Sequence, residues 1–305
     1  MTLDNALAAF ILDQRLKGNT DKTIAGYQGF LGQFITWLEH NGIKHVQDLT
    51  LSQVNAYQLH LDSRRCENKS CKLTKRTVRT YMRCIRIFLS FCYSENFIAD
   101  PVHLKMKLPK AEKPVVEILT DEDVGKLLAV FGEDTISRRN KAIVCLMLDC
   151  GLRLSEVAGI RLPDINFDEG YIMVTGKGRK GRIVPIGKKV RQALEVYIRS
   201  RPDDSESFFL SVRKTPLSSN GIAQLMNRLK IQTGITRLHA HLLRHTYATN
   251  FLVHGLGDVY ELSRLLGHGD IKITEGYLQL ASYYTILQNR NRQTYLDMKE
   301  ARKPT

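Results

Sequence analysis

Five side chains suited to phosphate chemistry are scattered through the second half of the sequence. His241 and Arg244 stand in "HLLRHTYAT", and Arg153 follows a glycine and a leucine in "DCGLRLSE". His268 lies between two glycines in "LLGHGD", and Tyr277 follows it in "KITEGYLQL". A guanidinium presents a planar fork of donors that fits phosphate oxygens, and a tyrosine hydroxyl can act as a nucleophile. Together, the residues predict metal-free attack on a phosphate whose negative charge grows in the transition state.

A basic turn adds a candidate proton donor. In "GYIMVTGKGRKGRIVPIG", the β-rich runs 171–175 and 182–186 flank the turn that contains Lys177 and Arg179. A phosphate-binding P-loop must open a helix, whereas this turn is expected to join two strands. We therefore expect no ATP site, and we take Lys177 as the candidate proton donor.

Each of these residues also has an ordinary interpretation when it is taken alone. A single histidine or tyrosine is more often a packing residue than a catalytic one, and two separated arginines can simply form ion pairs. The sequence contains no HExxH motif and no two CxxC pairs. Cys66 and Cys71 flank a predicted surface loop, where a metal clip or a disulfide is the less favoured interpretation. We expect no metal and no cofactor.

The charge of the chain favours a polyanionic partner. The 305 residues carry a formal charge of +14 at an ordinary charged content of 25%. Residues 1–110 hold 16 Lys and Arg against 9 Asp and Glu, and residues 111–305 hold 29 against 22, so each part carries +7. Nucleic acid is the commonest partner of such a protein; a basic soluble protein or one that touches anionic membranes is the alternative. The absence of a signal peptide or an apolar spanning run predicts a cytoplasmic protein without a membrane partner. A nucleic-acid partner would make it nucleoid-associated.

The first hundred residues read as helices. One helix is expected to begin after Thr20 and to end at Asn41, and a capping box at Thr50 opens the next. A third helix, over about 74–96, has one apolar and one basic stripe, with no acidic residue from Lys72 to Tyr93. A solvated charged face is the usual interpretation of such a stripe, but charges of one sign repel each other. We therefore predict that residues of this stripe contact a DNA backbone, and that Arg179 of the basic turn does so too. The predicted residues of the stripe are Lys75, Arg76, Arg79, Arg83 and Arg86.

A proline-containing stretch separates this region from the rest of the chain. We expect a helical domain over 1–107, a linker over 108–119 and a second domain over 120–305. Thr120 and Asp123 are placed to start the first helix of the second domain. The fold class is mainly α, with a small β-sheet or hairpin in the second domain.

The order Arg153, Lys177, His241-x-x-Arg244, His268 and Tyr277 resembles that of the tyrosine recombinases, the phage-integrase and Xer-type family. "GLRLSE", "GKGRKGRIVPI", "HLLRHTYAT" and "LLGHGDIKITEGY" resemble the signature segments of that family, over about 160 residues. The resemblance implies a helical, SAM-like core-binding domain, a mostly α catalytic domain and a C-terminal assembly tail. It is looser in the first domain.

The resemblance also implies roles for these residues. Tyr277 would attack a DNA phosphate to form a 3′-phosphotyrosine link and free a 5′-hydroxyl. Arg153 and Arg244 would clamp the non-bridging oxygens, and Lys177 would protonate the leaving oxygen. His241 would assist proton transfer at the tyrosine, and His268 would hold the phosphate; Glu156 and His245 are interpreted as supporting residues. Members of the family act as homo-tetramers on two double-stranded DNA duplexes, some with an accessory DNA-bending protein.

Two departures bear on the biological role. "SRRCENKSCKLTK" is longer than the matching Xer loop, and "LQL" after Tyr277 lacks the histidine common in Xer proteins. We therefore expect a recombinase that integrates or excises a mobile element. The alternatives are Xer-type dimer resolution, a type IB topoisomerase-like enzyme that relaxes DNA as a monomer, and a DNA-binding protein without catalysis. The recombination site and its spacer do not follow from the sequence.

Overall fold

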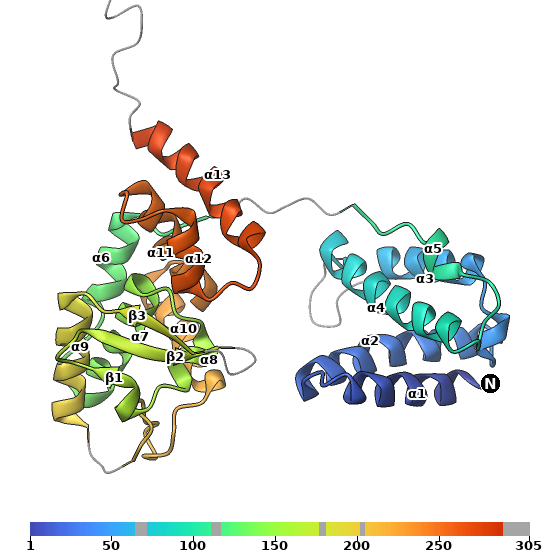
Figure 1. Cartoon of the computed structure of the whole chain (residues 1–305), viewed down its shortest axis with the longest axis horizontal. Coiled ribbons are helices and arrows are strands. Elements are labelled where there is room, and N and C mark those ends of the chain that lie inside the picture. The colour runs from blue at the N-terminus through green and yellow to red at the C-terminus, as the bar shows by residue number, and fades with distance from the viewer. Residues whose placement is uncertain (65–71, 111–116, 177–180, 202–204, 289–305) are drawn as a thin grey trace, which may run out of the picture. The chain divides into compact units, whose positions relative to one another are not determined.

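The computed structural model describes residues 1–64, 72–110, 117–176, 181–201 and 205–288. The chain divides into two compact units, Met1–Pro114 and Val115–Thr305, and each is described here by itself (Figure 1). Among the residues singled out above, Cys66, Cys71, Lys177 and Arg179 lie outside the described residues, as does the part of the C-terminal tail (281–305) from residue 289 onward.

The first unit consists of helices around one apolar core. Phe10 lies at its centre and makes edge-on ring contacts with Tyr27, Phe88 and Phe91. Such contacts between aromatic rings add to the stabilisation that burial provides. The helical segments are α1 (Leu3–Leu16), α2 (Asp21–His40), η1 (Val46–Asp48), α3 (Leu51–Ser63), α4 (Lys75–Ser94) and α5 (Val102–Lys105).

Polar caps begin these helices at the residues that the sequence predicts. The Thr20 hydroxyl accepts a hydrogen bond from the Thr23 backbone N–H at 3.3 Å, and α2 starts at the next residue. The Thr50 backbone N–H donates to Gln53 Oε1 at 2.8 Å, which is one half of a capping box. The predicted helix bounds are therefore confirmed to within two residues, including the ends of α4.

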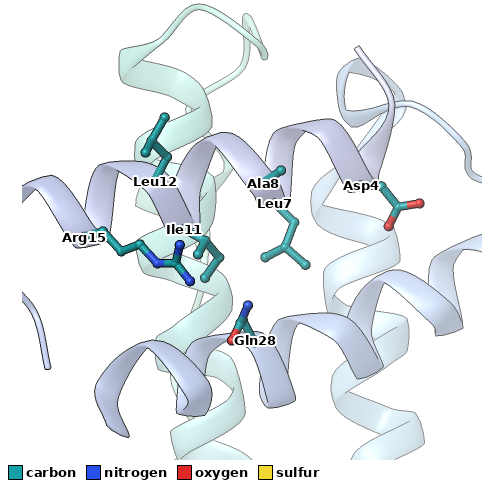
Figure 2. Close-up of a pocket in the computed structure, with 7 residues that line it drawn as sticks. All are labelled: Asp4, Leu7, Ala8, Ile11, Leu12, Arg15 and Gln28. Carbon is teal, nitrogen blue, oxygen red and sulfur yellow. The ribbon is translucent and has the colours of Figure 1, made fainter. Parts of the chain in front are cut away.

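A shallow hollow of about 400 Å³ lies between α1 and α2. Figure 2 shows Leu7 and Ile11 of α1 on one side of it and Gln28 of α2 on the other, with Asp4 and Arg15 toward its ends. None of the residues expected to act on a phosphate lines this hollow.

The second unit is mixed, and its three strands form one antiparallel sheet in the order β1-β2-β3. The sequence predicts only a hairpin, so β1 (Ile165–Asn166) is an addition; two residues are too short to show a strand pattern. Strands β2 (Tyr171–Thr175) and β3 (Gly181–Pro185) pair with Ile172 opposite Val184. β3 begins and ends one residue earlier than expected.

Helices pack around the sheet and supply most of the core of this unit. α7 packs against α9 and α11, so that it lies in the middle of the unit. The Leu119 backbone N–H donates to Thr246 Oγ1 at 2.9 Å, which ties the chain just before α6 to α11. The helical segments are α6 (Asp121–Ala129), α7 (Thr135–Asp149), α8 (Leu154–Ala158), η2 (Leu162–Asp164), α9 (Lys188–Ser200), α10 (Ser219–Thr233), α11 (Ala240–Val253), α12 (Val259–Leu266) and α13 (Ile271–Gln288).

The last three helices carry most of the predicted chemical residues. α13 packs against α11 and α12, and it extends beyond them in Figure 1. Tyr277 of α13 is part of a small apolar cluster with Ala248, Phe251, Leu262 and Leu266. These contacts determine the rotation of α13, and they turn the tyrosine toward α11 and α12.

Candidate active site

A glycine turn between α7 and α8 places the first arginine. α7 ends at Asp149, and Gly151 has a φ of +61°, a conformation that side chains disfavour. A Cβ at residue 151 would lie 2.3 Å from the Tyr247 ring, so a larger residue would not fit. Arg153 directly precedes α8, and its side chain remains one-third exposed (34%).

Arg244, on α11, is buried in the middle of the site with 1% of its surface exposed. Its Nη1 donates to the Gly151 carbonyl at 2.6 Å, and its Nη2 donates to the Leu266 carbonyl at 2.8 Å. Nη2 also lies 2.9 Å from His268 Nε2. The guanidinium therefore joins the turn after α7 to the end of α12.

The C-terminal end of α12 receives three arginines on three successive carbonyls. Arg182 Nε donates to Leu265 O at 2.6 Å, Arg244 Nη2 to Leu266 O at 2.8 Å, and Arg153 Nη2 to Gly267 O at 3.1 Å. The last carbonyls of a helix lack partners within it and carry partial negative charge, so cations are favourable there. His268 follows this end directly.

The buried carboxylate of Glu156 links two of these arginines. Its oxygens accept from the Arg153 backbone N–H (2.7 Å), Arg153 Nη1 (2.8 Å), and both terminal nitrogens of Arg182 (2.9 Å each). Burial raises the pKa of Glu156, but these hydrogen bonds outweigh burial and hold the pKa at about 2. Glu156 is therefore ionised at neutral pH.

The rings of His268 and Tyr277 are neighbours and nearly parallel. The two rings are 6.4 Å apart between centroids, with 6° between their planes. His268 Nδ1 lies 2.7 Å from Thr274 Oγ1, and its Nε2 faces the Arg244 donor. Since arginine only donates, Nε2 accepts and Nδ1 carries the proton, so the imidazole is neutral.

His241 lies at the edge of the site, with His245 next to it. The His245 ring centroid is 4.8 Å from that of His241 and 5.4 Å from that of Tyr277. His245 Nδ1 is buried and has no hydrogen-bond partner within the described residues. The sequence assigns proton transfer to His241, but the histidine of this pair that makes ring contact with Tyr277 is His245.

Burial and positive charge together define the electrostatics of the site. Burial, followed by the nearby arginines, lowers the pKa of His268 to about 4. Burial, followed by His241, lowers the pKa of His245 to about 4. Burial raises the pKa of the Tyr277 phenol, although Arg244 and Arg153 counteract it. A phosphate would supply the negative charge that this cationic surface lacks.

The structure thus brings Arg153, Arg244, His268 and Tyr277 together, with His241 reaching them through His245. Lys177 and Arg179 lie between β2 and β3 in the sequence, outside the described residues. Sequence reasoning missed Arg182 and Thr274. Arg182 stands in the quoted segment "GKGRKGRIVPI", but its residue type alone does not distinguish it from its basic neighbours.

Three residues of the basic stripe on α4 already have partners within the protein, which the sequence does not indicate. Lys75 forms an ion pair with Asp62 at 2.9 Å, Arg79 Nη1 donates to the Pro109 carbonyl at 2.9 Å, and Arg86 donates to the Met106 carbonyl. Arg76 and Arg83 are exposed, and no ion pair involves them within the described part of the chain. These two residues are the best-placed members of the stripe for an outside anion.

Two further kinds of site are not found among the described residues. No group of three or more His, Cys, Asp or Glu side chains there could hold a metal ion. No helix in the described ranges is long and apolar enough to span a bilayer.

Comparisons with known proteins identify the family of this chain. The model of the phage integrase family matches residues 117–283, which include every candidate catalytic residue. The chain is 31% identical over 271 residues to tyrosine recombinase XerC of Oceanobacillus iheyensis, with 86% of each chain covered. It is 30% identical over 287 residues to tyrosine recombinase XerD of Pseudomonas aeruginosa, with 92% of each chain covered.

Solved structures show the same fold. The chain is similar to the Tn1549 transposon integrase in complex with circular intermediate DNA, with a TM-score of 0.73 and 19% identity over 91% of this chain and 95% of that one. It is also similar to a lambda integrase dimer bound to a COC′ core site, with a TM-score of 0.71, 18% identity and the same coverage. The chain therefore belongs to the phage integrase family of tyrosine recombinases, enzymes that cleave and rejoin DNA strands.

Proposed function

We propose that this recombinase is of the Xer type and resolves dimers of a chromosome or a plasmid. The support is its similarity to proteins named XerC and XerD along nearly their whole lengths. These relatives favour the Xer interpretation over the mobile element that the sequence suggested. The departures that suggested a mobile element are confined to two short segments, the loop around 63–75 and the residues after Tyr277.

The observation that carries the proposed chemistry is the convergence of Arg153, Arg244, His268 and Tyr277 on one cationic surface. Arg153 and Arg244 would clamp the non-bridging oxygens of the scissile phosphate. Charge on these oxygens grows as the nucleophile approaches, so prepositioned donors stabilise the transition state more than the ground state. The negative charge of a bound phosphate would favour protonation of His268 at Nε2, and that N–H would then donate to the same phosphate.

Tyr277 would attack the phosphorus through its phenol oxygen. A bond forms between that oxygen and phosphorus, and the bond from phosphorus to the 5′-oxygen breaks. The phenol proton passes to a base, for which His241 is the candidate; His245 contacts the rings of both Tyr277 and His241. The leaving oxygen takes a proton from Lys177. The phosphodiester energy is kept in the 3′-phosphotyrosine link, so rejoining needs no ATP.

The proposed partner is double-stranded DNA at a specific site, bound by a homo-tetramer that holds two duplexes. An accessory DNA-bending protein and a location on the nucleoid in the cytoplasm are further expectations of this function. The residues over 281–305, after Tyr277, are the proposed assembly tail.

Plasmid multimers test the proposal directly. A plasmid would carry a duplex that the wild-type protein selects from a random-sequence pool, and its multimers would be followed in cells that express each variant. Wild-type protein should convert multimers to monomers and leave an SDS-resistant protein–DNA adduct. Tyr277→Phe lacks the nucleophilic oxygen, so the yield of plasmid monomers and the yield of the adduct should each fall by more than about 1000-fold.

Tyr283→Phe is the matched control, because Tyr283 lies on the same helix but is exposed (58%). It should keep the activity of the wild type. An adduct that persists in Tyr277→Phe would reject the role of Tyr277. Selected sites that occur only at the ends of mobile elements, with multimers left unresolved, would reject the Xer interpretation.

A further inference from the structure

We propose that Arg182 is a positioning residue for cleavage: it holds Glu156 and the end of α12 so that Arg153 and His268 face the phosphate. The inference rests on the roles proposed above for Arg153 and His268. Arg182 itself is not proposed to touch DNA, because each of its three guanidinium nitrogens already donates to an acceptor within the protein.

The first part of the inference comes from the Arg182–Glu156 pair. Both terminal nitrogens of Arg182 lie 2.9 Å from a carboxylate oxygen of Glu156, which is a two-point contact with fixed geometry. The other donors to that carboxylate both belong to Arg153. Arg182 therefore fixes the carboxylate from one side while Arg153 is oriented by it from the other.

The second part is charge balance. Without Arg182, the carboxylate of Glu156 would be hydrogen-bonded to Arg153 alone, with Arg244 Nη1 farther away at 4.0 Å, and it would offset most of the positive charge that a phosphate needs at Arg153. A second cation shares the negative charge and leaves the Arg153–Arg182–Glu156 group with a net positive charge. Since Arg153 is one-third exposed and Arg182 is nearly buried, the net positive charge of this group is accessible to a phosphate at Arg153.

The third part is the contact with α12. Arg182 Nε donates to the Leu265 carbonyl, two residues before Gly267 and three before His268. Gly267 has a φ of +63°, and a Cβ there would lie 2.9 Å from Arg182 Nη1. A glycine at this position lets the arginine pass directly under the turn that leads to His268. Strand β3 thus supports the histidine through a single side chain.

Replacement of Arg182 tests the inference. In Arg182→Gln, the rate of adduct formation on saturating selected duplex should fall about 100-fold, as expected for a small misplacement of reacting groups. The dissociation constant for that duplex should stay within about twofold, because Arg182 does not face DNA. Arg182→Lys keeps the charge but loses the two-point contact, so it should recover only part of the rate.

The pH dependence separates positioning from a loss of folding. In Arg182→Gln, burial would raise the pKa of Glu156 without the opposing bonds from Arg182. As the pH is lowered, the rate should then begin to fall at a higher pH than the rate of the wild type does. In the double variant Glu156→Gln, Arg182→Gln, no carboxyl titrates there, so this extra loss should vanish. The fold-loss of the rate in the double variant should also be smaller than the product of the fold-losses in Glu156→Gln and Arg182→Gln.

Arg191→Gln is the matched control, because Arg191 also forms an Arg–Glu pair, with Glu195 on α9 at 3.0 Å. It should leave the rate and its pH dependence unchanged. A wild-type rate in Arg182→Gln would overturn the inference. Two results together would show that Arg182 only stabilises the fold. The rate in Arg182→Gln would be lowered by the same factor at every pH, and the fold-loss in the double variant would equal the product of the fold-losses in the two single variants. Neither result would affect the role of Tyr277, which the adduct formed by the wild type tests separately.

Discussion

Arg244 shows how one side chain serves both the fold and the chemistry. A buried guanidinium is costly unless its donors are satisfied. Here, carbonyls of the turn after α7 and of the end of α12 accept from it, and His268 lies within hydrogen-bond distance. Burial lowers the pKa of Arg244 to about 10, so it stays charged at neutral pH. The same bonds that satisfy the arginine fix its direction.

The neutral histidines lead to a prediction about stability at acid pH. The pKa of His245 and that of His268 are about 4 in the folded protein, against an ordinary value of 6.5. Between these values the unfolded chain binds more protons than the folded one, so stability should fall as the pH drops from about 6.5 to about 4. Thermal unfolding measured across this range should show a falling Tm.

Replacement of one histidine isolates the effect. His245→Leu removes a titrating group, so its Tm should fall less between about pH 6.5 and about pH 4 than that of the wild type. His254→Leu, at an exposed residue just after the same helix, should follow the wild type. Equal slopes for His245→Leu and the wild type would contradict the assignment of a buried, neutral His245.

At the scale of elements, the C-terminal end of α12 is the point on which the site is built. Arg182 from β3, Arg153 from the turn before α8 and Arg244 from α11 donate to its last carbonyls. Segments distant in the sequence therefore meet at one helix end, whose partial negative charge attracts cations. The end in turn directs His268 toward Tyr277 of α13.

Helix α4 carries a prediction about DNA binding. Arg76 and Arg83 are exposed, whereas Arg79 and Arg86 donate to backbone carbonyls. The double variant Arg76→Gln, Arg83→Gln should bind the selected duplex more weakly. The slope of log K against log salt should become shallower by about one for each residue replaced. Titrations at several salt concentrations measure both quantities.

Arg15→Gln, at an exposed residue of α1 in the same unit, is the control and should leave the slope unchanged. If the slope in the double variant equals that of the wild type, the exposed part of the stripe is only a solvated face.

At the scale of the whole molecule, the two compact units and their equal net charge of +7 fit a protein that contacts one polyanion with both parts. A recombination reaction needs four strand cleavages, and each chain contributes one Tyr277. We therefore expect four chains and two duplexes in the complex with the selected site. Mass photometry of the purified complex measures this composition.

One chain on one duplex, together with relaxation of supercoiled plasmid, would contradict the expected assembly. That result would favour the topoisomerase-like alternative. Tyr277→Phe should assemble like the wild type, because it loses only the reacting oxygen.

The sequence alone predicted a mainly helical chain, the helices after Thr20, Thr50 and about Thr74, the two strands of the hairpin and the residues proposed to act on a phosphate. Caps such as Thr20 and Thr50 and the spacing of apolar residues are local signals, so helix bounds follow from neighbouring residues. The order of Arg153, Lys177, His241, Arg244, His268 and Tyr277 was enough to indicate the family. The sequence also suggested a mobile element, and the Xer relatives do not support that interpretation.

Only the tertiary structure decided how these residues work together. Arg182 and Glu156 are 26 positions apart, and Arg182 and Leu265 are 83 apart, so no local pattern relates them. The same holds for the stripe on α4, where Asp62 and the carbonyls of Met106 and Pro109 take up charges that looked unpaired. A hydrogen bond acts over about 3 Å in space whatever the separation along the chain, and only the folded chain brings its partners within that distance.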